Sequence, residues 1–362
     1  MTDGRARAPA VRRPPTLHTS YRQTFRLWRG KEWWCLLSGI GVTLIWPFLV
    51  NAFWLHLSNL ALIAVVATVG LNLLSGNARL VSLGQAALLA VGGFTAGILG
   101  AQYDLPFWLC LLTSLGTGGL TGILVGVPSL RLKAIYVAIT TLALHFAVTT
   151  LVSIYQTEAV RAQGIVMPIP DFVFAKLGDS RPWFYFLLLV VALVIVAALN
   201  LERSYIGRRW IAVADHEVAA RSAGINISVA KLTAFAISSA MVSLAGALGA
   251  YYEGVLTAET YDIQLAITSL AMIIVGGVGS VLGSVLGALL LTFLPYLLDA
   301  AMKPAGIALS GGSLNGIHSI AYGTLILLFL VFEPLGLAAV WYRIRNTCML
   351  WPLKYTPLEA KR

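Results

Sequence analysis

Apolar runs of membrane length alternate with short polar stretches along most of this chain. Runs of about 17 to 23 residues can cross a hydrocarbon core of about 30 Å as α-helices. This pattern predicts ten spans, at residues 34–53, 57–76, 83–101, 105–127, 134–154, 183–200, 231–252, 264–279, 281–298 and 316–336. The eighth and ninth are the least clear division, because GGVGSVLGS at 276–284 is equally compatible with a turn, a break or a helix contact.

The polar stretches divide the chain into three parts. We expect a basic N-terminal arm at 1–33, a transmembrane domain at 34–336 and a C-terminal tail at 337–362. The longest predicted external loop is 155–182, and the longest polar interruption of the second half is 201–231. Five spans precede the external loop and five follow it, which is the topology of a 5+5 inverted repeat. No internal sequence identity supports that symmetry.

Composition places the chain in the all-α polytopic membrane class. Hydrophobic residues make up 58% of it and charged residues only 11%, against about 25% charged in soluble domains. The three cysteines, Cys35, Cys110 and Cys348, have no CxxC spacing and no neighbouring His. They therefore predict neither a disulfide framework nor a metal site.

The net charge of +10 follows the membrane topology, so it does not indicate a nucleic-acid partner. With the N-terminus inside, 21 basic residues fall on the inner side and 4 on the outer side. Lys and Arg accumulate in cytoplasmic loops. The bias predicts a multi-pass membrane protein with both termini cytoplasmic, and a cytoplasmic loop at 201–231.

Small residues recur at four-residue spacing in the fourth span and again at the eighth and ninth. This spacing places them on one helix face, where they let helix backbones approach closely in lipid. Tight packing is the main interpretation and a moving hinge the alternative. The glycines concerned are Gly118, Gly122, Gly126, Gly279, Gly283 and Gly287.

Polar side chains at membrane depth must find a partner or line a wet path. One group shares a face of the fifth span, with Tyr136 nearer the cytoplasm, and another gathers where the second and third spans meet the inside. Interhelical hydrogen bonding and a translocation path lined by neutral groups are both open interpretations. The residues are Asn72, Ser82, Gln85, Tyr136, Thr141, His145 and Thr149.

Several catalytic motifs are absent from the sequence. No GxxxxGK[ST] occurs, so the chain has no P-loop for nucleotide phosphates. LSGGS at 309–313 resembles an ATPase signature but falls in a predicted external loop, where we expect a turn. Asp215-His216-Glu217 is not a zinc helix, because Ala220 stands where HExxH needs its second His. We therefore expect no catalytic residues and no cofactors in this chain.

Four segments in order resemble one family. LNLLSGNARLVSLGQAALLAVGGFTA at 71–96 resembles the LN-L--G-AGLVSLGHAAF-G-GAYTA pattern of permease subunits of branched-chain amino-acid ABC importers, the LivM-like group. PSLRLKAIYVAITTLAL at 128–144 is similar to its P-LRLRG-Y-AI-TLAF segment. GRRWIAVADHEVAARSAGIN at 207–226 resembles its cytoplasmic loop, and IVGGVGSVLGSVLG at 274–287 its V-GG-GS--GP-LGA run.

The resemblance implies a type II ABC importer-like permease in a bacterial inner membrane. Its partners would be a second, LivH-like permease, cytoplasmic ATPase subunits that bind ATP and Mg, and a periplasmic solute-binding protein. It also implies that a short helix, Ala214–Ala223, docks on the ATPase. The coupling residues would be Arg208, Arg209, Asp215, His216, Glu217, Arg221 and Gly224.

The chain departs from the family pattern at two informative positions. Arg79 stands where the family usually has Gly, and Glu217 comes one place early relative to the importer motif EAA---G. The resemblance implies import of branched-chain or other amino acids, and its other members carry urea, short-chain amides or aromatic acids. The solute and the subunit stoichiometry stay open.

Two rival functions remain. An ion-coupled secondary transporter would take up solute without an ATPase, although no span carries a central charged pair of the kind that such carriers use. An integral-membrane enzyme would have to use His145 or His216, and its activity would be lost when either is replaced.

Overall fold

The computed structural model describes residues 43–130, 134–159, 164–170, 179–302, 320, 323–324, 327–329 and 336–350. Contacts divide the chain into two units, 1–50 and 51–362. In the first unit, residues 43–49 are helical. The predicted arm 1–33, most of the predicted first and tenth spans, the segment 309–313 and the tail beyond 350 lie outside the described residues.

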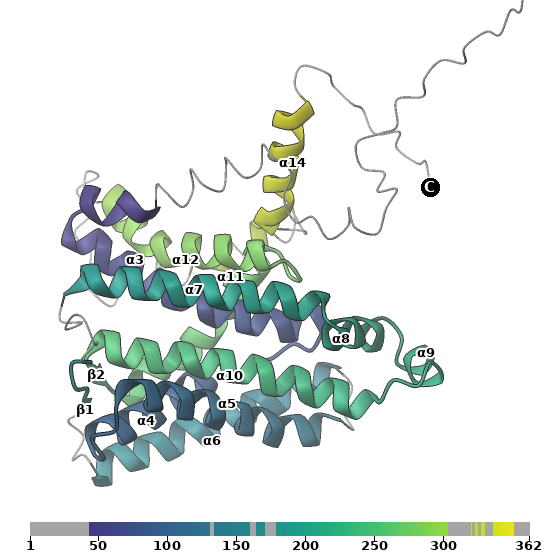
Figure 1. Cartoon of the computed structure of the whole chain (residues 1–362), viewed down its shortest axis with the longest axis horizontal. Helices are drawn as coiled ribbons and strands as arrows, with labels where there is room; N and C mark the ends of the chain where they lie inside the picture. Colours follow the sequence, from purple (N-terminus) through teal and green to yellow (C-terminus); the bar gives the residue numbers. More distant parts are fainter. Residues whose placement is uncertain are drawn as a thin grey trace, which may run out of the picture. The chain divides into compact units, whose positions relative to one another are not determined.

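The second unit is a set of long helices whose limits follow the predicted spans within a few residues, apart from one helix at 336–350 that falls in the predicted tail (Figure 1). Six helical segments among the described residues are long and apolar enough to cross a membrane, so the chain is a helical, multi-pass membrane protein. The full count of ten and the inverted repeat stay predictions. The long helices are α3 (Ala52–Asn72), α4 (Gln85–Ala101), α5 (Phe107–Ser129), α6 (Ala134–Ala159), α7 (Ser180–Arg203), α10 (Ile227–Glu253), α11 (Ile263–Gly276), α12 (Val281–Met302) and α14 (Gly336–Leu350).

Helix α10 lies at the centre of the second unit and packs against α3, α4 and α5. Serine hydroxyls tie it to two of these neighbours. Ser238 donates to the carbonyl oxygen of Gly70 in α3 at 2.7 Å, and Ser243 donates to that of Leu88 in α4 at 2.8 Å. Such bonds hold helices together in lipid, where apolar area alone gives little drive to associate.

The contact between α4 and α10 is made by backbone against backbone. A Cβ placed on Gly92 would lie 1.9 Å from the carbonyl oxygen of Ser243, and one on Gly246 would lie 2.0 Å from that of Leu89. No side chain fits at either position. The two helices therefore interlock through a pair of glycines, one on each helix.

The two predicted glycine rows lie at helix contacts of this kind. Added Cβ atoms on Gly118 and Gly122 would meet Ser243 and Phe235 of α10 at 2.2 and 2.6 Å, so the α5 row faces α10. Gly126 faces Leu232 of the same helix. In the second row Gly283 and Gly287 of α12 face α11, while Gly279 lies in the turn between them with φ +84°.

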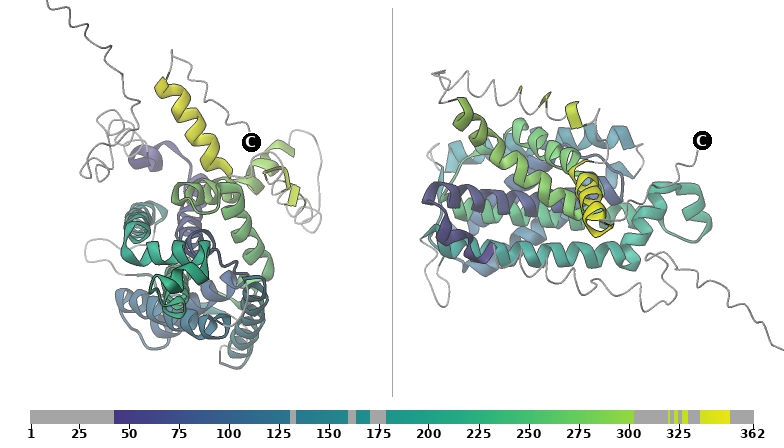
Figure 2. Two further views of the ribbon diagram at one scale, coloured as in Figure 1. Left: turned by 90° about the vertical axis from the view of Figure 1, so that its right-hand side faces the viewer. Right: turned by 90° about the horizontal axis from the view of Figure 1, so that it is seen from above.

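A second group of helices packs around α3, which contacts α7, α11 and α12 as well as α10. Helix α14 adds contacts to α11 and α12 (Figure 2). Asn59 of α3 donates to the carbonyl oxygen of Ser180 in α7 at 2.9 Å. Helix α3 thus lies between the α4–α5–α10 group and the α7–α11–α12 group.

The break between the predicted eighth and ninth spans is a turn. Helix α11 ends at Gly276, and α12 begins at Val281, packed against α11. With 14 residues, α11 rises about 21 Å, which is less than the hydrocarbon thickness of about 30 Å. The 264–298 region therefore holds one short helix and one of full length.

Three short elements interrupt the helical pattern. The segment η1 (Leu73–Asn77) continues α3 as a π-helical turn, and η2 (Ala258–Tyr261) is a 3-10 turn before α11. Strands β1 (Ile165–Val166) and β2 (Val255–Leu256) pair antiparallel, with Ile165 opposite Leu256. This small sheet is the exception to the predicted all-α class.

Two short helices, α8 (Tyr205–Asp215) and α9 (Glu217–Ser222), occupy the predicted polar loop (Figure 1). They lie between the end of α7 and the start of α10. Ser204 caps α8 by accepting from the amides of Ile206 and Gly207, and Asn226 caps α10 by accepting from that of Val229. The caps fix where each helix starts, because they satisfy amides that the first turn leaves free.

Gly246→Ala should destabilise the fold by forcing α4 and α10 apart. Overpacking a tight contact costs about 1–3 kcal/mol, and the added Cβ would overlap a backbone oxygen that cannot turn away. We expect the apparent melting temperature of the detergent-purified chain to fall by about 3 °C or more.

Gly116→Ala is the matched control, because a Cβ there meets open space on the exposed side of α5. Alanine also favours a helix interior over glycine by about 1 kcal/mol. This variant should melt at the same temperature or higher. Equal melting of both variants would contradict the backbone contact.

Candidate coupling surface and translocation cavity

The helix predicted at Ala214–Ala223 is not continuous. The chain breaks at His216, whose extended backbone (φ −154°, ψ 101°) separates α8 from α9. The prediction was wrong on this point because the charge pattern of Asp215, Glu217 and Arg221 suits a single helix dipole equally well. Asp215 ends α8, and Glu217 begins α9.

Gly224 ends α9. It adopts φ +80°, and its amide donates to the carbonyl oxygen of Arg221 at 3.0 Å. The amide of Ile225 donates to that of Ala220, also at 3.0 Å. The two bonds form a Schellman motif, which favours glycine at the left-handed position.

Glu217 anchors α9 to α10. Its Oε1 lies 2.6 Å from the Nζ of Lys231. The Lys231 residue is only 8% exposed, whereas the Glu217 side chain is about half exposed. A buried ammonium needs a compensating charge, so Glu217 holds the start of α9 against the first turns of α10.

Asp215 and Glu202 anchor the other side of this loop to the end of α3. Asp215 pairs with Arg79 at 2.9 Å, and Asn77 of η1 donates to the Oε1 of Glu202 in α7 at 3.1 Å. Arg79 has φ 51°, a left-handed conformation that glycine adopts more readily. The segment that follows α3 therefore contacts both the end of α7 and the end of α8.

The remaining predicted coupling residues lie on α8, on α9 or between them. Arg208, His216 and Arg221 are exposed. The Arg209 guanidinium stacks on the Tyr205 ring, with Cζ 3.8 Å from the ring centroid, and also donates to the Tyr205 hydroxyl. Sequence reasoning missed Val218, an apolar side chain on α9 that is 81% exposed.

Three of the predicted path residues are buried near the turn that follows α3. Asn72 accepts from the amide of Gly279 at 2.8 Å, and Ser82 accepts from that of Gly84 at 3.3 Å. Neither polar atom of the Gln85 side chain has a hydrogen-bond partner among the described residues, and the same holds for the Asn72 amide nitrogen. Buried polar atoms of this kind usually bind water.

The other four predicted path residues belong to α6, and they differ in how deeply they are buried. Thr141 is buried and accepts from the amide of Leu83 at 2.9 Å, and His145 is buried on the same face. Thr149 is half-buried and donates to the carbonyl oxygen of His145 at 2.8 Å. Tyr136 is exposed on the helix surface. The structure therefore brings Thr141, but not Tyr136, to the segment after α3.

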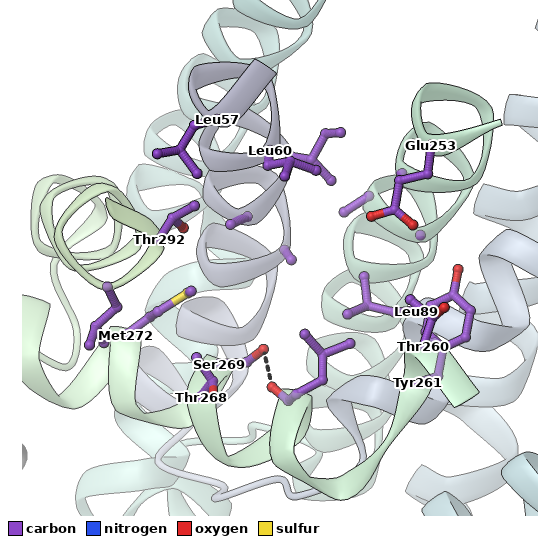
Figure 3. Close-up of a pocket in the computed structure, with 18 of the residues that line it drawn as sticks. Leu57, Leu60, Leu89, Glu253, Thr260, Tyr261, Thr268, Ser269, Met272 and Thr292 are labelled. Carbon is purple, nitrogen blue, oxygen red and sulfur yellow. Dashed lines mark hydrogen bonds between the residues drawn. The ribbon is translucent and has the colours of Figure 1, made fainter. Parts of the chain in front are cut away.

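A cavity of about 320 Å³ lies among α3, α4, α10, η2, α11 and α12. Its wall is mainly aliphatic, with Leu57 and Leu60 from α3, Leu89 from α4 and Met272 from α11 (Figure 3). None of the seven predicted path residues lines it. The cavity is at the lower end of the range for small-molecule sites, about 300–1,000 Å³.

Glu253 and two residues of η2 contribute polar groups to one side of this cavity. The Glu253 carboxylate points toward it from the last residue of α10, close to Thr260 and Tyr261 of η2 (Figure 3). Ser269 also lines the cavity and donates to the carbonyl oxygen of Leu265 at 2.8 Å. Burial raises the pKa of the Tyr261 phenol, and the Glu253 charge raises it further, so the hydroxyl stays protonated.

The charge on the cavity wall is of one sign. Among the described residues that line it, Glu253 is the only carboxylate, and none is Lys, Arg or His. The two ion pairs found in the described part of the chain do not include Glu253. Among the described residues, the exposed Glu253 carboxylate on the cavity wall thus has no cationic partner.

Helices α3 and α10 connect the cavity to the loop that contains α8 and α9. Helix α10 begins beside α9 and reaches the cavity at its last turns, and α3 lines the cavity before it ends at η1. Asn72 lies five residues, or about 8 Å, beyond Ala67, the last residue of α3 on the cavity wall. The contact of Asn72 with Gly279 therefore lies between the cavity and the loop.

A search of family models and curated proteins identifies relatives of this chain. The family model described as branched-chain amino acid transport system / permease component matches residues 53–332. The high-affinity branched-chain amino acid transport system permease protein LivM of Salmonella typhimurium is 29% identical over 83% of this chain and 74% of that protein. The autoinducer 2 import system permease protein LsrC of Yersinia enterocolitica is 27% identical over 60% of this chain and 61% of that protein.

One further relative is also a permease protein. The probable branched-chain amino acid transport permease protein LivM of Methanocaldococcus jannaschii is 28% identical over 61% of this chain and 64% of that protein. No solved structure matches the chain. Since the family model covers most of the sequence, the chain belongs to the branched-chain amino acid transport system permease component family.

Proposed function

We propose that this chain is the permease subunit of an ATP-binding-cassette importer in a bacterial inner membrane. Its partners are a second permease, cytoplasmic ATPase subunits that bind ATP and Mg, and a periplasmic solute-binding protein. Its cargo is an amino acid or a related small polar solute. The family membership supports this assignment, as do the permease relatives of importers for branched-chain amino acids and autoinducer 2.

The observation that carries the proposal is the helical pair α8–α9. The pair connects α7 to α10, is rich in basic residues and presents the exposed side chains of Val218 and Arg221. An excess of Lys and Arg indicates the cytoplasmic side. Helix α9 then faces the ATPase, with Val218 as an apolar contact and Arg221 as a charged contact at the rim.

The contacts of α8 and α9 suggest how ATPase movement reaches the membrane. A push on α9 acts on α10 through Glu217 and Lys231, and a push on α8 acts on η1 through Asp215 and Arg79. The segment after α3 also touches the turn between α11 and α12, because an added Cβ on Gly76 would lie 2.5 Å from Gly279. Moving this segment away from Gly279 would open the cavity toward the cytoplasm.

The Val218→Asp variant tests the docking role. An aspartate in the ATPase contact would have to be desolvated without a partner, so we expect coupled uptake to fall at least tenfold. The measurement is ATP-dependent solute uptake by the complete complex in proteoliposomes, together with the amount of ATPase that copurifies.

Val218→Leu is the matched control, because it keeps the apolar character at the same position. It should retain uptake and copurification. Unchanged coupled uptake by Val218→Asp would show that α9 does not dock on the ATPase.

Glu217→Gln separates anchoring from docking. The substitution leaves the buried Lys231 ammonium without its counter-charge. We expect a loss of about 1 kcal/mol in local stability, because the Glu217 side of the pair is about half exposed to water. Deuterium exchange at residues 217–226 should rise about fivefold in the purified chain without any ATPase present.

Arg221→Gln is the control for this measurement, because Arg221 is exposed and forms neither of the two ion pairs in the described part of the chain. Exchange in this variant should match that of the parent protein. If Glu217→Gln exchanges like the parent while uptake is lost, Glu217 contacts the ATPase directly and does not act as an anchor.

A further inference from the structure

Helices α12 and α14 enclose an apolar groove of about 420 Å³, which shares no residue with the cavity described above. We propose that this groove binds the acyl chain of an anionic phospholipid of the cytoplasmic leaflet, and that the arginines of α14 attract its headgroup. The site goes beyond the proposed function, because its ligand is a lipid and its occupation does not depend on the importer assignment.

The beginning of α14 lies on the loop side of the helix bundle. Gly336 packs against the turn between α11 and α12, where an added Cβ would lie 2.5 Å from the amide nitrogen of Gly277. The same turn contacts the end of α3 through Gly279, and the segment that follows α3 forms an ion pair with the end of α8. With the loop on the cytoplasmic side, as its basic residues indicate, α14 lies at the cytoplasmic leaflet.

Helix α14 runs across the direction of the long helices (Figure 1), and the view from above in Figure 2 shows it foreshortened. Its 15 residues rise about 22 Å, which is less than the hydrocarbon thickness of about 30 Å. It is not among the helical segments of the described residues that are long and apolar enough to cross a membrane. Because the long helices cross the bilayer, a helix that runs across them lies along the membrane surface.

The sequence of α14 is that of a helix at a membrane interface. Its only charged residues are Arg343 and Arg345, and it contains neither Asp nor Glu. Apolar side chains spaced three and four residues apart share the face that lines the groove. Helices that lie in the interface combine an apolar face of this kind with basic residues that attract anionic lipids. The groove residues of α14 are Leu337, Val340, Trp341 and Ile344.

The length of the groove matches the hydrocarbon of one leaflet. Its wall on α12 extends from Leu286 to Leu297, which corresponds to a rise of about 16 Å. Half of a hydrocarbon core of about 30 Å is about 15 Å. The acyl chain of a lipid in the cytoplasmic leaflet can therefore contact this wall over its whole length.

The side chains of the groove fit an acyl chain better than another helix. Among the described residues that line it, all are Leu, Ile, Val, Phe or Trp, and none is Gly, Ala, Ser or Thr. Helices that associate in lipid approach each other through such small residues, as α4 and α10 do at Gly92 and Gly246. Large branched and aromatic side chains keep a second backbone at a distance, but a flexible acyl chain can fill the space between them.

The charge of α14 favours an anionic headgroup. Arg343 is exposed next to Ile344, the last groove residue of α14. A guanidinium binds phosphate oxygens through paired hydrogen bonds. Trp341 and Tyr342 are about half exposed, and such aromatic residues are enriched at the level of the headgroups. In a zwitterionic headgroup the lipid's own ammonium cancels the phosphate charge, so α14 favours phosphatidylglycerol over phosphatidylcholine.

Lipid binding by the purified full-length chain tests the site. The chain in detergent is titrated with phosphatidylglycerol or with phosphatidylcholine that carries the same acyl chains, and bound lipid is counted by native mass spectrometry. We expect the first phosphatidylglycerol to bind at least fivefold more tightly than the first phosphatidylcholine, because only the anionic lipid gains from the arginines.

Val340→Trp tests the groove, because the larger side chain occupies the space of the acyl chain. Binding of the first phosphatidylglycerol should weaken at least fivefold. Val127→Trp is the matched control, because Val127 is an exposed apolar residue of α5 that does not line the groove, and it should bind lipid like the parent.

Arg343→Gln/Arg345→Gln tests the headgroup contact. The double variant should lower the preference for phosphatidylglycerol to less than twofold and leave the binding of phosphatidylcholine unchanged. Lys354→Gln/Lys361→Gln removes the same charge from the tail beyond α14 and should keep the preference.

Equal affinity of the parent for the two lipids would overturn the anionic site, as would an equal loss of preference in both double variants. Unchanged lipid binding by Val340→Trp would overturn the groove as the place of the acyl chain. If that variant also fails to copurify with the second permease, the groove is an interface between the two permeases. Uptake by the complete complex enters none of these outcomes, so they are independent of the importer assignment.

Discussion

The backbone contact between α4 and α10 is the constraint on which the rest of the structure depends. Gly92 and Gly246 bring the two helices to a separation that no side chain permits. The α5 glycines add a second close approach on another side of α10. Packed in this way, α10 has little freedom to bend, and a displacement at its first turn must be passed to its last turn. The anchor at Lys231 and the carboxylate of Glu253 therefore belong to one rigid element.

The end of helix α3 is held less rigidly than α10. It lines the same cavity but ends in a π-helical turn, a feature that often occurs at functional sites. From Asn72 onward the chain is held by separate polar contacts to Gly279, Glu202, Asp215 and Thr141. Contacts of this kind can be exchanged one at a time, whereas interlocked glycines cannot. The cavity is thus bordered by α10, which transmits movement, and by α3, whose end can be displaced.

The sequence predicted the membrane helices well because their limits are set by the solvent. An apolar run must end where the hydrocarbon ends, so hydropathy locates α4, α5 and α7 within a few residues. The cavity could not be found in this way. Its wall combines aliphatic residues that look like lipid-facing surface with a carboxylate, Glu253, that looks like the external end of a span. Only the arrangement of helices brings them together, and polarity within single spans led instead to Asn72 and His145, which do not line the cavity.

The break at His216 gives a shared explanation for the two departures from the family pattern. Arg79 stands where the family has Gly, and Glu217 stands one place early; in the structure each forms an ion pair on a different side of the break. Asp215 ties the end of α8 to the segment after α3, and Glu217 ties the start of α9 to α10. A continuous helix would have forced both anchors to move as one. The extended residue between them lets the two anchors move separately, so that one part of a loop movement reaches α10 and another part reaches the end of α3. The cavity can then change at its end nearer the loop, while its wall on α10 stays intact.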